Sequence, residues 1–317
     1  TYLEKELIID TRAPQIEIYT KAHNVSQGGS GLVIYRLSEP CPRSGISVGG
    51  RFFPGYSGAF QDRDVYLAFF ALAYDQGRGT ELYVGADDRA GNRTRAGLAH
   101  YIRRKKFKQD TIKISDQFLN WKMPEFKIDL PNATPAEKFL AVNRDQRRAD
   151  YKQIQEICKT PLRVVHWNGR FLRLPKSAPR AGFADHRTYT YNGKEIDRQV
   201  HLGADLASTE RAPVPAANGG VVVFAGQLGI YGRSVFIDHG FGLFSMYAHL
   251  NQIMAKKGQT VAKGEILGKT GTTGLAGGDH LHFGILVRDT FVNPVEWWDA
   301  TWIKHNITSK IDMAKSR

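Results

Sequence analysis

Short apolar stretches separated by turn residues run through the first hundred residues of the chain. Four such stretches, rich in β-branched and aromatic residues, lie at residues 16–19, 31–37, 65–72 and 81–86. Clusters of Gly, Ser and Asp at 26–30 and 75–79 provide turns between them. The spacing is typical of an antiparallel β-sandwich, which we expect to span residues 12–108.

A turn near the end of this region carries a short motif. Residues 88–92 read Asp-Arg-Ala-Gly-Asn and resemble the Asp-x-Ala-Gly-Asn turn of bacterial immunoglobulin-like domains. The resemblance implies that the N-terminal sandwich is immunoglobulin-like.

A helix start follows the sandwich. Thr134 is suited to the N-cap, Pro135 to the first helical position and Glu137 to the closing of a capping box. Apolar residues recur at helical spacing as far as Cys158, so we expect a helix over 134–158 within a linker region at 109–174.

A second β-rich block follows the linker. Apolar stretches at 220–225, 234–238, 243–249 and 280–287 predict strands, and the turn residues 239–242 predict a hairpin between two of them. We expect a C-terminal antiparallel β domain at 175–303 and a tail at 304–317. The chain as a whole is therefore predicted to be mainly β.

Composition narrows the classes of partner. The 317 residues carry a formal net charge of +13, which favours an anionic partner such as nucleic acid, a membrane surface or a cell-wall polymer. The basic run 103–108 lacks a nucleic-acid-binding fold around it and is interpreted as a solvated edge, so no nucleic-acid partner is expected. Two cysteines, Cys41 and Cys158, can form one bridge or stay free.

No stretch reaches the ~20 apolar residues of a membrane span, so no membrane span is expected. The chain begins with Thr1 rather than Met, and we expect that an export signal or anchor has been removed.

Histidines and one aspartate form the strongest constellation in the second block. They are His201, Asp205, His249, His280 and His282. Imidazole and carboxylate suit Zn²⁺, and residues two apart in a strand share a face, so the last two histidines can line one site. A straight strand would separate His201 from Asp205 by about 13 Å. A bend at Gly203 brings them together, and a helical turn, which Gly disfavours, is the alternative.

Three separated motifs in this block resemble the signature of the lysostaphin-type, or LytM-domain, zinc metallopeptidases. The matching segments are His201-x-Gly203-x-Asp205, Tyr247-Ala248-His249-Leu250 and His280-Leu281-His282-Phe283. The resemblance covers roughly residues 175–302. It implies that His201, Asp205 and His282 hold one Zn²⁺ per chain, and that His249 and His280 beside the metal are the catalytic histidines.

The resemblance also implies an endopeptidase that cuts peptidoglycan stem peptides or cross-bridges by metal-activated water. It implies a location in the bacterial cell envelope, periplasmic or exported. Tyr189 and Tyr191 are expected at the groove wall as substrate contacts. The N-terminal domain is expected to position the enzyme, restrain it or dock it on other envelope proteins.

Departures from the family pattern and competing interpretations remain. Asp279 stands where the family commonly has Pro, and Gly284 where it commonly has Glu. Asp279 is a weaker candidate for a fourth ligand.

The alternative function is a catalytically silent or autoinhibited LytM-like module that regulates another hydrolase, although such modules typically lack one or more of the five positions present here. The tryptophans Trp297, Trp298 and Trp302 are expected to pack the C-terminal edge rather than to stack on sugars.

Overall fold

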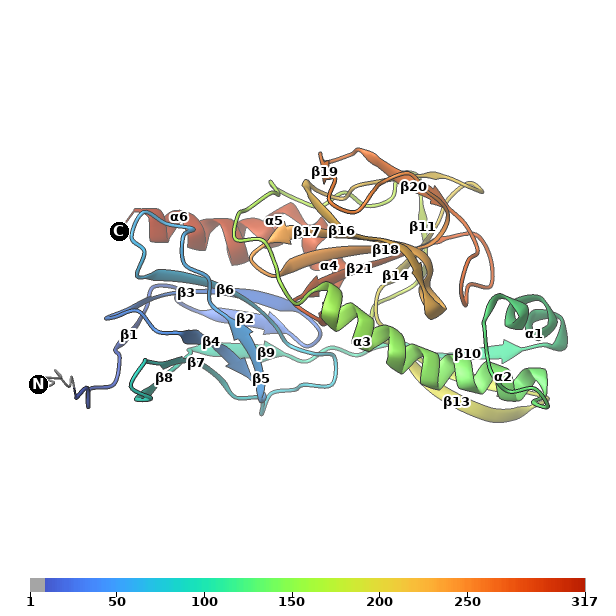
Figure 1. Cartoon of the computed structure of the whole chain (residues 1–317), viewed down its shortest axis with the longest axis horizontal. Helices are drawn as coiled ribbons and strands as arrows, with labels where there is room; N and C mark the ends of the chain where they lie inside the picture. The colour runs from blue at the N-terminus through green and yellow to red at the C-terminus, as the bar shows by residue number, and fades with distance from the viewer. Residues whose placement is uncertain (1–8, 317) are drawn as a thin grey trace, which may run out of the picture.

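Two β-rich parts joined by a helical segment make up residues 9–316, which the computed structural model describes (Figure 1). Strands hold 42% of the residues and helices 19%, so the prediction of a mainly β chain is confirmed. Among the described residues, no helix combines the length and apolarity that crossing a bilayer requires.

The N-terminal part consists of two antiparallel sheets, ordered β1-β3-β6 and β5-β4-β7-β8, and a parallel pair, β2-β9. Its strands are β1 (Ile16–Ile18), β2 (His23–Ser26), β3 (Ser30–Leu37), β4 (Arg43–Val48), β5 (Arg51–Pro54), β6 (Val65–Ala71), β7 (Leu82–Asp87), β8 (Arg93–Gly97) and β9 (His100–Arg103). The four strands predicted from apolar stretches are present. The immunoglobulin-like character of this part stays a prediction.

The predicted helix start at Thr134 is confirmed. Glu137 N–H donates to Thr134 Oγ1 at 3.3 Å, and Thr134 N–H donates to Glu137 Oε2 at 2.8 Å, which completes the capping box. The helical run is α2 (Pro135–Ala141), a π-helical turn η2 (Val142–Gln146) and α3 (Arg147–Ile157).

The expected linker region also contains structure that the sequence did not predict. It begins with strand β10 (Gln109–Ile114), followed by α1 (Asp116–Lys122) and the short 3-10 helix η1 (Met123–Glu125). Strand β10 pairs in parallel with β12 (Asp185–Tyr191) of the C-terminal part, so the linker is built into the sheet next to it. Only Ile112 and Ile114 of the six residues of β10 are apolar, and one inward position holds Asp110, so β10 lacks the apolar stretch that marks the predicted strands.

The C-terminal part is centred on a large sheet whose main path is β11-β14-β21-β18-β17-β16-β19, beside the small sheet β10-β12-β13. Its remaining strands are β11 (Ala178–Ala181), β13 (Lys194–His201), β14 (Ala204–Ala207), β15 (Pro213–Pro215), β16 (Gly220–Leu228), β17 (Gly232–Gly240), β18 (Leu243–Ile253), β19 (Thr260–Val261), β20 (Ile266–Thr270), β21 (Leu281–Val287) and β22 (Thr290–Val292). The predicted hairpin is confirmed as β17–β18.

The expected tail at 304–317 is helical in its described part, with the π-helical turn η4 (Lys304–Thr308) and α6 (Ser309–Lys315). Two short helices, α4 (Pro294–Trp298) and α5 (Ala300–Ile303), precede it at the end of the C-terminal domain, and the 3-10 turn η3 (Gly229–Tyr231) lies between β16 and β17. Helix α6 extends beside the N-terminal strands (Figure 1). Lys310 Nζ donates to Leu32 O of β3 at 3.2 Å, so the described part of this segment is anchored rather than loose. Residue 317 lies outside the described residues.

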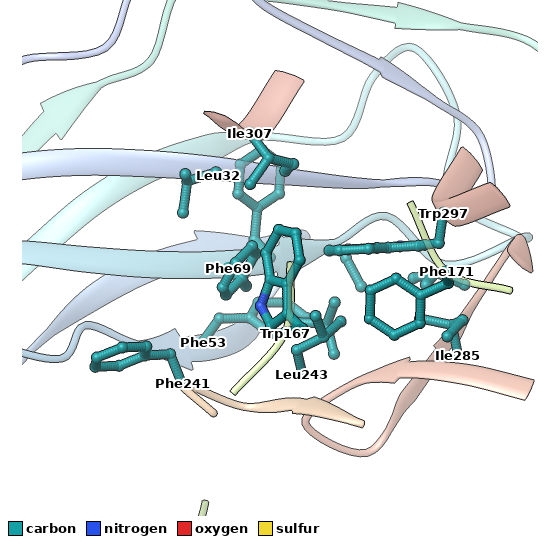
Figure 2. Packing of buried hydrophobic residues seen from close by; sticks show 14 of the residues in the cluster. Leu32, Phe53, Phe69, Trp167, Phe171, Phe241, Leu243, Ile285, Trp297 and Ile307 are labelled. Carbon is teal, nitrogen blue, oxygen red and sulfur yellow. The ribbon is translucent and has the colours of Figure 1, made fainter. Parts of the chain in front are cut away.

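One hydrophobic cluster joins the two parts of the molecule. Trp297 is fully buried and lies among Phe69 of β6, Trp167 and Phe171 (Figure 2). Its indole N–H donates to Ser30 Oγ at 3.1 Å. Trp297 is therefore a packing residue, as expected, but it packs the interface of the two parts rather than the C-terminal edge alone. The cysteines Cys41 and Cys158 are both free.

Candidate metal centre

Three strands bring the predicted ligands His201, Asp205 and His282 together. His201 ends β13, Asp205 lies in β14 and His282 lies in β21, directly opposite Asp205 in the antiparallel register. The chain bends between β13 and β14 at Gly203, so the bend interpretation is confirmed over the helical one. A side chain at Gly203 would collide with His282, because a Cβ there would lie 2.5 Å from His282 Cε1.

The donor atoms of these three residues form a tight triangle. His201 Nε2 lies 2.9 Å from Asp205 Oδ1 and 3.0 Å from His282 Nδ1, and His282 Nδ1 lies 2.8 Å from Asp205 Oδ1. All three side chains are buried, with exposed fractions of 7% or less. Two imidazole nitrogens and one carboxylate oxygen at this spacing can share a single small ion.

The hydrogen bond made by the other ring nitrogen of His201, Nδ1, indicates whether a cation fits among the three donor atoms. His201 Nδ1 donates to Gly182 O at 2.8 Å, because a carbonyl can only accept. In the neutral ring Nε2 then presents a lone pair to the Asp205 oxygen, and two acceptors at 2.9 Å repel each other unless a cation or proton lies between them. The donor set therefore fits zinc, and the bond to Gly182 is the kind that orients a metal-binding imidazole.

The directions in which the pKa values of Asp205 and His282 are shifted agree with a role as metal ligands. Burial alone would raise the pKa of Asp205, but contacts with His201, His280 and His282 hold it well below its usual range. Burial lowers the pKa of His282 to about 4. The site thus offers an ionised carboxylate and a neutral imidazole at neutral pH.

Arg187 of β12 is a site residue whose role the sequence did not reveal. Its Nη2 lies 2.9 Å from Asp205 Oδ2, so the second carboxylate oxygen is held by an ion pair while Oδ1 faces the histidines. Arg187 lies two residues before Tyr189, which was expected at the groove wall, but the pairing with Asp205 depends on how two separate strands pack.

The two predicted catalytic histidines flank the triangle. His249 of β18 has a left-handed backbone, with φ of 59°, and its Nδ1 donates to Thr273 O at 2.8 Å. Such backbone strain in a non-glycine residue is frequent at functional sites. Burial, followed by the neighbouring His280 and His282, lowers the pKa of His249 well below its usual value. Its ring is therefore neutral.

His280 sits between His249 and Asp205. The two imidazole ring centroids are 4.8 Å apart, and His280 Nε2 lies 3.6 Å from Asp205 Oδ1. Burial opposes protonation of His280, yet the Asp205 carboxylate raises its pKa above the ordinary value. The two flanking histidines thus differ in their affinity for a proton.

A cavity of about 350 Å³ opens over these residues, and we call it the catalytic cavity. Tyr189 lies in its wall, as expected. Tyr191 does not line it; the Tyr191 hydroxyl donates to Asp116 Oδ1 at 2.6 Å instead. Asp279 also bonds elsewhere, accepting from Thr270 Oγ1 at 2.6 Å and from Arg211 N at 3.1 Å, so it is not grouped with the metal ligands.

The segment 109–147 supplies a wall of the catalytic cavity that sequence reasoning missed. Its lining residues are Ile112, Lys113 and Ile114 of β10, Phe118 of α1, Phe139 of α2 and Arg147 of α3. The apolar residues among them are typical of any packed helix or strand, so no signal in the sequence distinguishes them from core residues.

Helices α1 and η1, which we call the strap, connect this wall to the loop at residues 272–274. The Thr273 carbonyl of that loop is the hydrogen-bond acceptor for His249. Lys122, which is fully buried at the end of α1, donates to Thr272 O and to Glu125 Oε1. Glu125 Oε2 in turn accepts from Gly274 N at 3.2 Å. These bonds fix the two residues on either side of Thr273, whose carbonyl orients His249.

The sheet and the His-Asp-His centre define a metallopeptidase-like domain, and comparison with known proteins assigns its family. The model of Peptidase family M23 matches residues 199–294. This part of the chain is an M23 peptidase domain of the LytM type.

Curated relatives match over the same region. Over 97 residues, or 31% of this chain, it is 39% identical to a DD-carboxypeptidase/endopeptidase, Mpg, of Neisseria meningitidis serogroup B. Over 96 residues, or 30% of the chain, it is 38% identical to the peptidoglycan DD-endopeptidase ShyA of Vibrio cholerae. In each case the match spans only 22% of the relative's length.

A solved structure shares the fold over most of the chain. A crystal structure described as an M23 peptidase of Pseudomonas aeruginosa aligns with 87% of this chain and 95% of its own, with a TM-score of 0.55 and 21% identity. At this identity the likeness concerns the fold alone, but it extends well beyond the matched domain into the N-terminal part.

Proposed function

We propose that this chain is a zinc metalloendopeptidase that hydrolyses peptide bonds in peptidoglycan stem peptides or cross-bridges at the bacterial cell envelope. The observation that carries the proposal is the buried triangle of His201, Asp205 and His282 at the floor of a cavity, beside two further histidines. The M23 domain and the DD-endopeptidase relatives support the substrate class.

His201, Asp205 and His282 would hold the zinc. When bound, zinc polarises the scissile carbonyl and lowers the pKa of a water molecule towards ~7. Arg187 orients Asp205 by an ion pair with its second oxygen, Oδ2. The Gly182 carbonyl fixes the ring of His201.

His249 and His280 are the groups we assign to proton transfer. Each has its Nδ1 tied to a backbone carbonyl, that of Thr273 for His249 and that of Gly278 for His280, so Nε2 is the nitrogen left to take or give a proton. Neutral imidazole can accept the proton of the attacking water, and imidazolium can return it to the leaving amine.

The test is hydrolysis of purified peptidoglycan by the wild type, by the wild type after chelation, and by His201→Ala. We expect chelation and His201→Ala each to abolish release of fragments, and added zinc to restore only the chelated wild type. His305→Ala, which changes an exposed histidine remote in sequence from the motifs, is the control and should retain full activity.

Mass spectrometry of the released fragments identifies the bond that is cut. Circular dichroism checks that each variant is folded. Equal turnover by metal-free protein would overturn the zinc mechanism. A folded, zinc-loaded wild type that cleaves no peptidoglycan would favour the regulatory module instead.

A further inference from the structure

A second cavity, of about 510 Å³, lies between the N-terminal part, helix α3 and the C-terminal sheets. We call it the basic cavity. Its polar wall includes Arg51 of β5, Tyr74, and Arg147, Arg148 and Lys152 of α3. It is thus assembled from elements on both sides of the M23 domain boundary, and residues outside that domain supply its cations.

The basic cavity adjoins the catalytic cavity. Arg147, Leu202 and Tyr231 line both. Leu202 follows the metal-site residue His201 directly, and the Tyr231 ring lies 5.5 Å from the ring of His282. These three residues thus form the boundary between the two cavities, and a ligand that extends from the metal centre across this boundary reaches the basic cavity.

Positive charge dominates the lining, which has four cationic side chains and one carboxylate, that of Asp75. Within residues 9–316, Arg148 forms an ion pair with Asp145, whereas Arg51, Arg147 and Lys152 form none. The charges of Arg51 and Lys152 are therefore available to a ligand, whereas that of Arg147 also acts on Asp150.

Neutral groups hold two of these cations in place. The Arg147 guanidinium donates from Nε to Asn143 O at 3.1 Å and from Nη2 to Asn143 Oδ1 at 2.7 Å. Arg51 Nη1 donates to Thr290 Oγ1 at 3.4 Å. The guanidinium groups are thus oriented without being neutralised, which is the condition for strong recognition of a carboxylate.

Nearby carboxylates are engaged by neutral donors. Asp150 of α3 accepts from Ile230 N at 2.8 Å and from Gln146 Nε2 at 2.7 Å. Asp289 accepts from Gln155 Nε2 at 2.9 Å. Neither forms a salt bridge with the basic side chains of the cavity within the described part of the chain.

We propose that the basic cavity is a substrate subsite that binds the free carboxylates of the peptidoglycan stem peptide on one side of the scissile bond. The inference rests on the proposed function, because that function places a stem-peptide carbonyl at the metal centre. Because the two cavities share lining residues, the rest of the same peptide would occupy the adjoining basic cavity. Stem peptides bear carboxylates, which complement the three cations that lack an ion-pair partner.

The test compares a synthetic stem tetrapeptide with free carboxylates and the same peptide with each carboxylate amidated. Amidation removes charge with little change in size. Calorimetry measures binding of both peptides to the zinc-loaded wild type and to the double variant Arg51→Gln/Lys152→Gln. The corresponding cross-linked dimers, free and amidated, measure kcat/KM.

The wild type is expected to prefer the free peptides about fivefold to tenfold, because two exposed ion pairs contribute about this much. The preference should weaken as the ionic strength is raised. The double variant should show a weaker preference than the wild type, because Arg147 is the only one of the three cations without an ion-pair partner that it keeps. Lys159→Gln, which alters an exposed cation that does not line the cavity, is the matched control and should behave as the wild type.

Equal binding of the free and amidated peptides by the wild type would overturn the inference, as would a double variant whose preference is as strong as that of the wild type. Loss of polyphosphate binding in the double variant with unchanged peptide binding would also overturn it, in favour of a phosphate polymer. Failure of the wild type to cleave either dimer contradicts the proposed function instead, and the calorimetric preference is read independently of cleavage.

Discussion

At the scale of single residues, His249 differs from the metal ligands although it lies beside them. Its ring centroid is 5.8 Å from that of His282, and its Nδ1 is bonded to Thr273 O rather than directed at the donor triangle. The close group of donor atoms is formed by His201, Asp205 and His282. Proton transfer and metal binding are therefore separable by substitution.

His249→Ala is expected to keep its zinc and to lose about 100-fold or more in kcat, the usual contribution of a positioned general acid or base. Zinc content measured by atomic emission, together with turnover of peptidoglycan fragments, checks this. Loss of zinc from the folded variant would place His249 among the ligands.

The sequence predicted which residues gather at the site better than it predicted what those residues touch. Two local features of the sequence can be tested against strand geometry. They are the spacing of His280 and His282 and the glycine between His201 and Asp205. The ion pair of Arg187 with Asp205 joins two strands by packing, and nothing local to either residue signals it. The same holds for Tyr191, whose hydroxyl bonds to Asp116 on α1.

At the scale of elements, the strap formed by α1 and η1 joins one wall of the catalytic cavity to the loop at Thr272 to Gly274. Lys122 is its central residue, because the buried amine binds both Thr272 O and Glu125. The strap thus acts on His249 through the position of the Thr273 carbonyl.

Lys122→Met is expected to lower the free energy of unfolding by about 1–3 kcal/mol, since it leaves the half-buried Thr272 carbonyl without its donor. Because the loop then holds the Thr273 carbonyl less firmly, kcat should fall while the zinc content is unchanged. Urea denaturation and steady-state kinetics measure the two effects. Lys127→Met, an exposed change in the same segment, should alter neither; equal effects of both substitutions would contradict the role of the strap.

Helix caps and strand pairings differ in how far the sequence predicts them. The capping box at Thr134 and Glu137 depends on residues three positions apart and was predicted correctly. The pairing of β10 with β12 depends on residues more than seventy positions apart, such as Gln109 and His186. Pattern alone therefore placed the helix but not the strand that begins the expected linker.

At the scale of the whole molecule, Glu296 of α4 ties the C-terminal helices to the N-terminal sheet. Its Oε2 accepts from Ser30 N at 3.0 Å. Burial raises the pKa of Glu296 from its ordinary value of 4.5 to about 7. Between these two pH values the native state holds a proton that the unfolded chain has lost, so the free energy of unfolding falls as the pH rises through this window.

Glu296→Gln removes this titration while keeping an acceptor for Ser30 N. Relative to the wild type, the variant is expected to gain about 1–2 kcal/mol in the free energy of unfolding on going from pH 4.5 to pH 8, after allowance for solvent screening. Urea denaturation of both proteins at the two pH values measures the difference. A difference that does not change with pH would contradict the assignment.

Strand β10 lies between the N-terminal part and the catalytic cavity, whose wall it helps to form. Strand β10 leaves the N-terminal sheets and pairs over six residues with β12, where Asp110 lies opposite Arg187. A swing of the N-terminal part against the C-terminal part would have to break the packing of Trp297 against Phe69 and the hydrogen bonds of Glu296 with Ser30 and of Lys310 with Leu32. The N-terminal part is therefore a rigid bracket rather than a tether, and whatever surface it rests on determines how far from that surface the metal centre can reach.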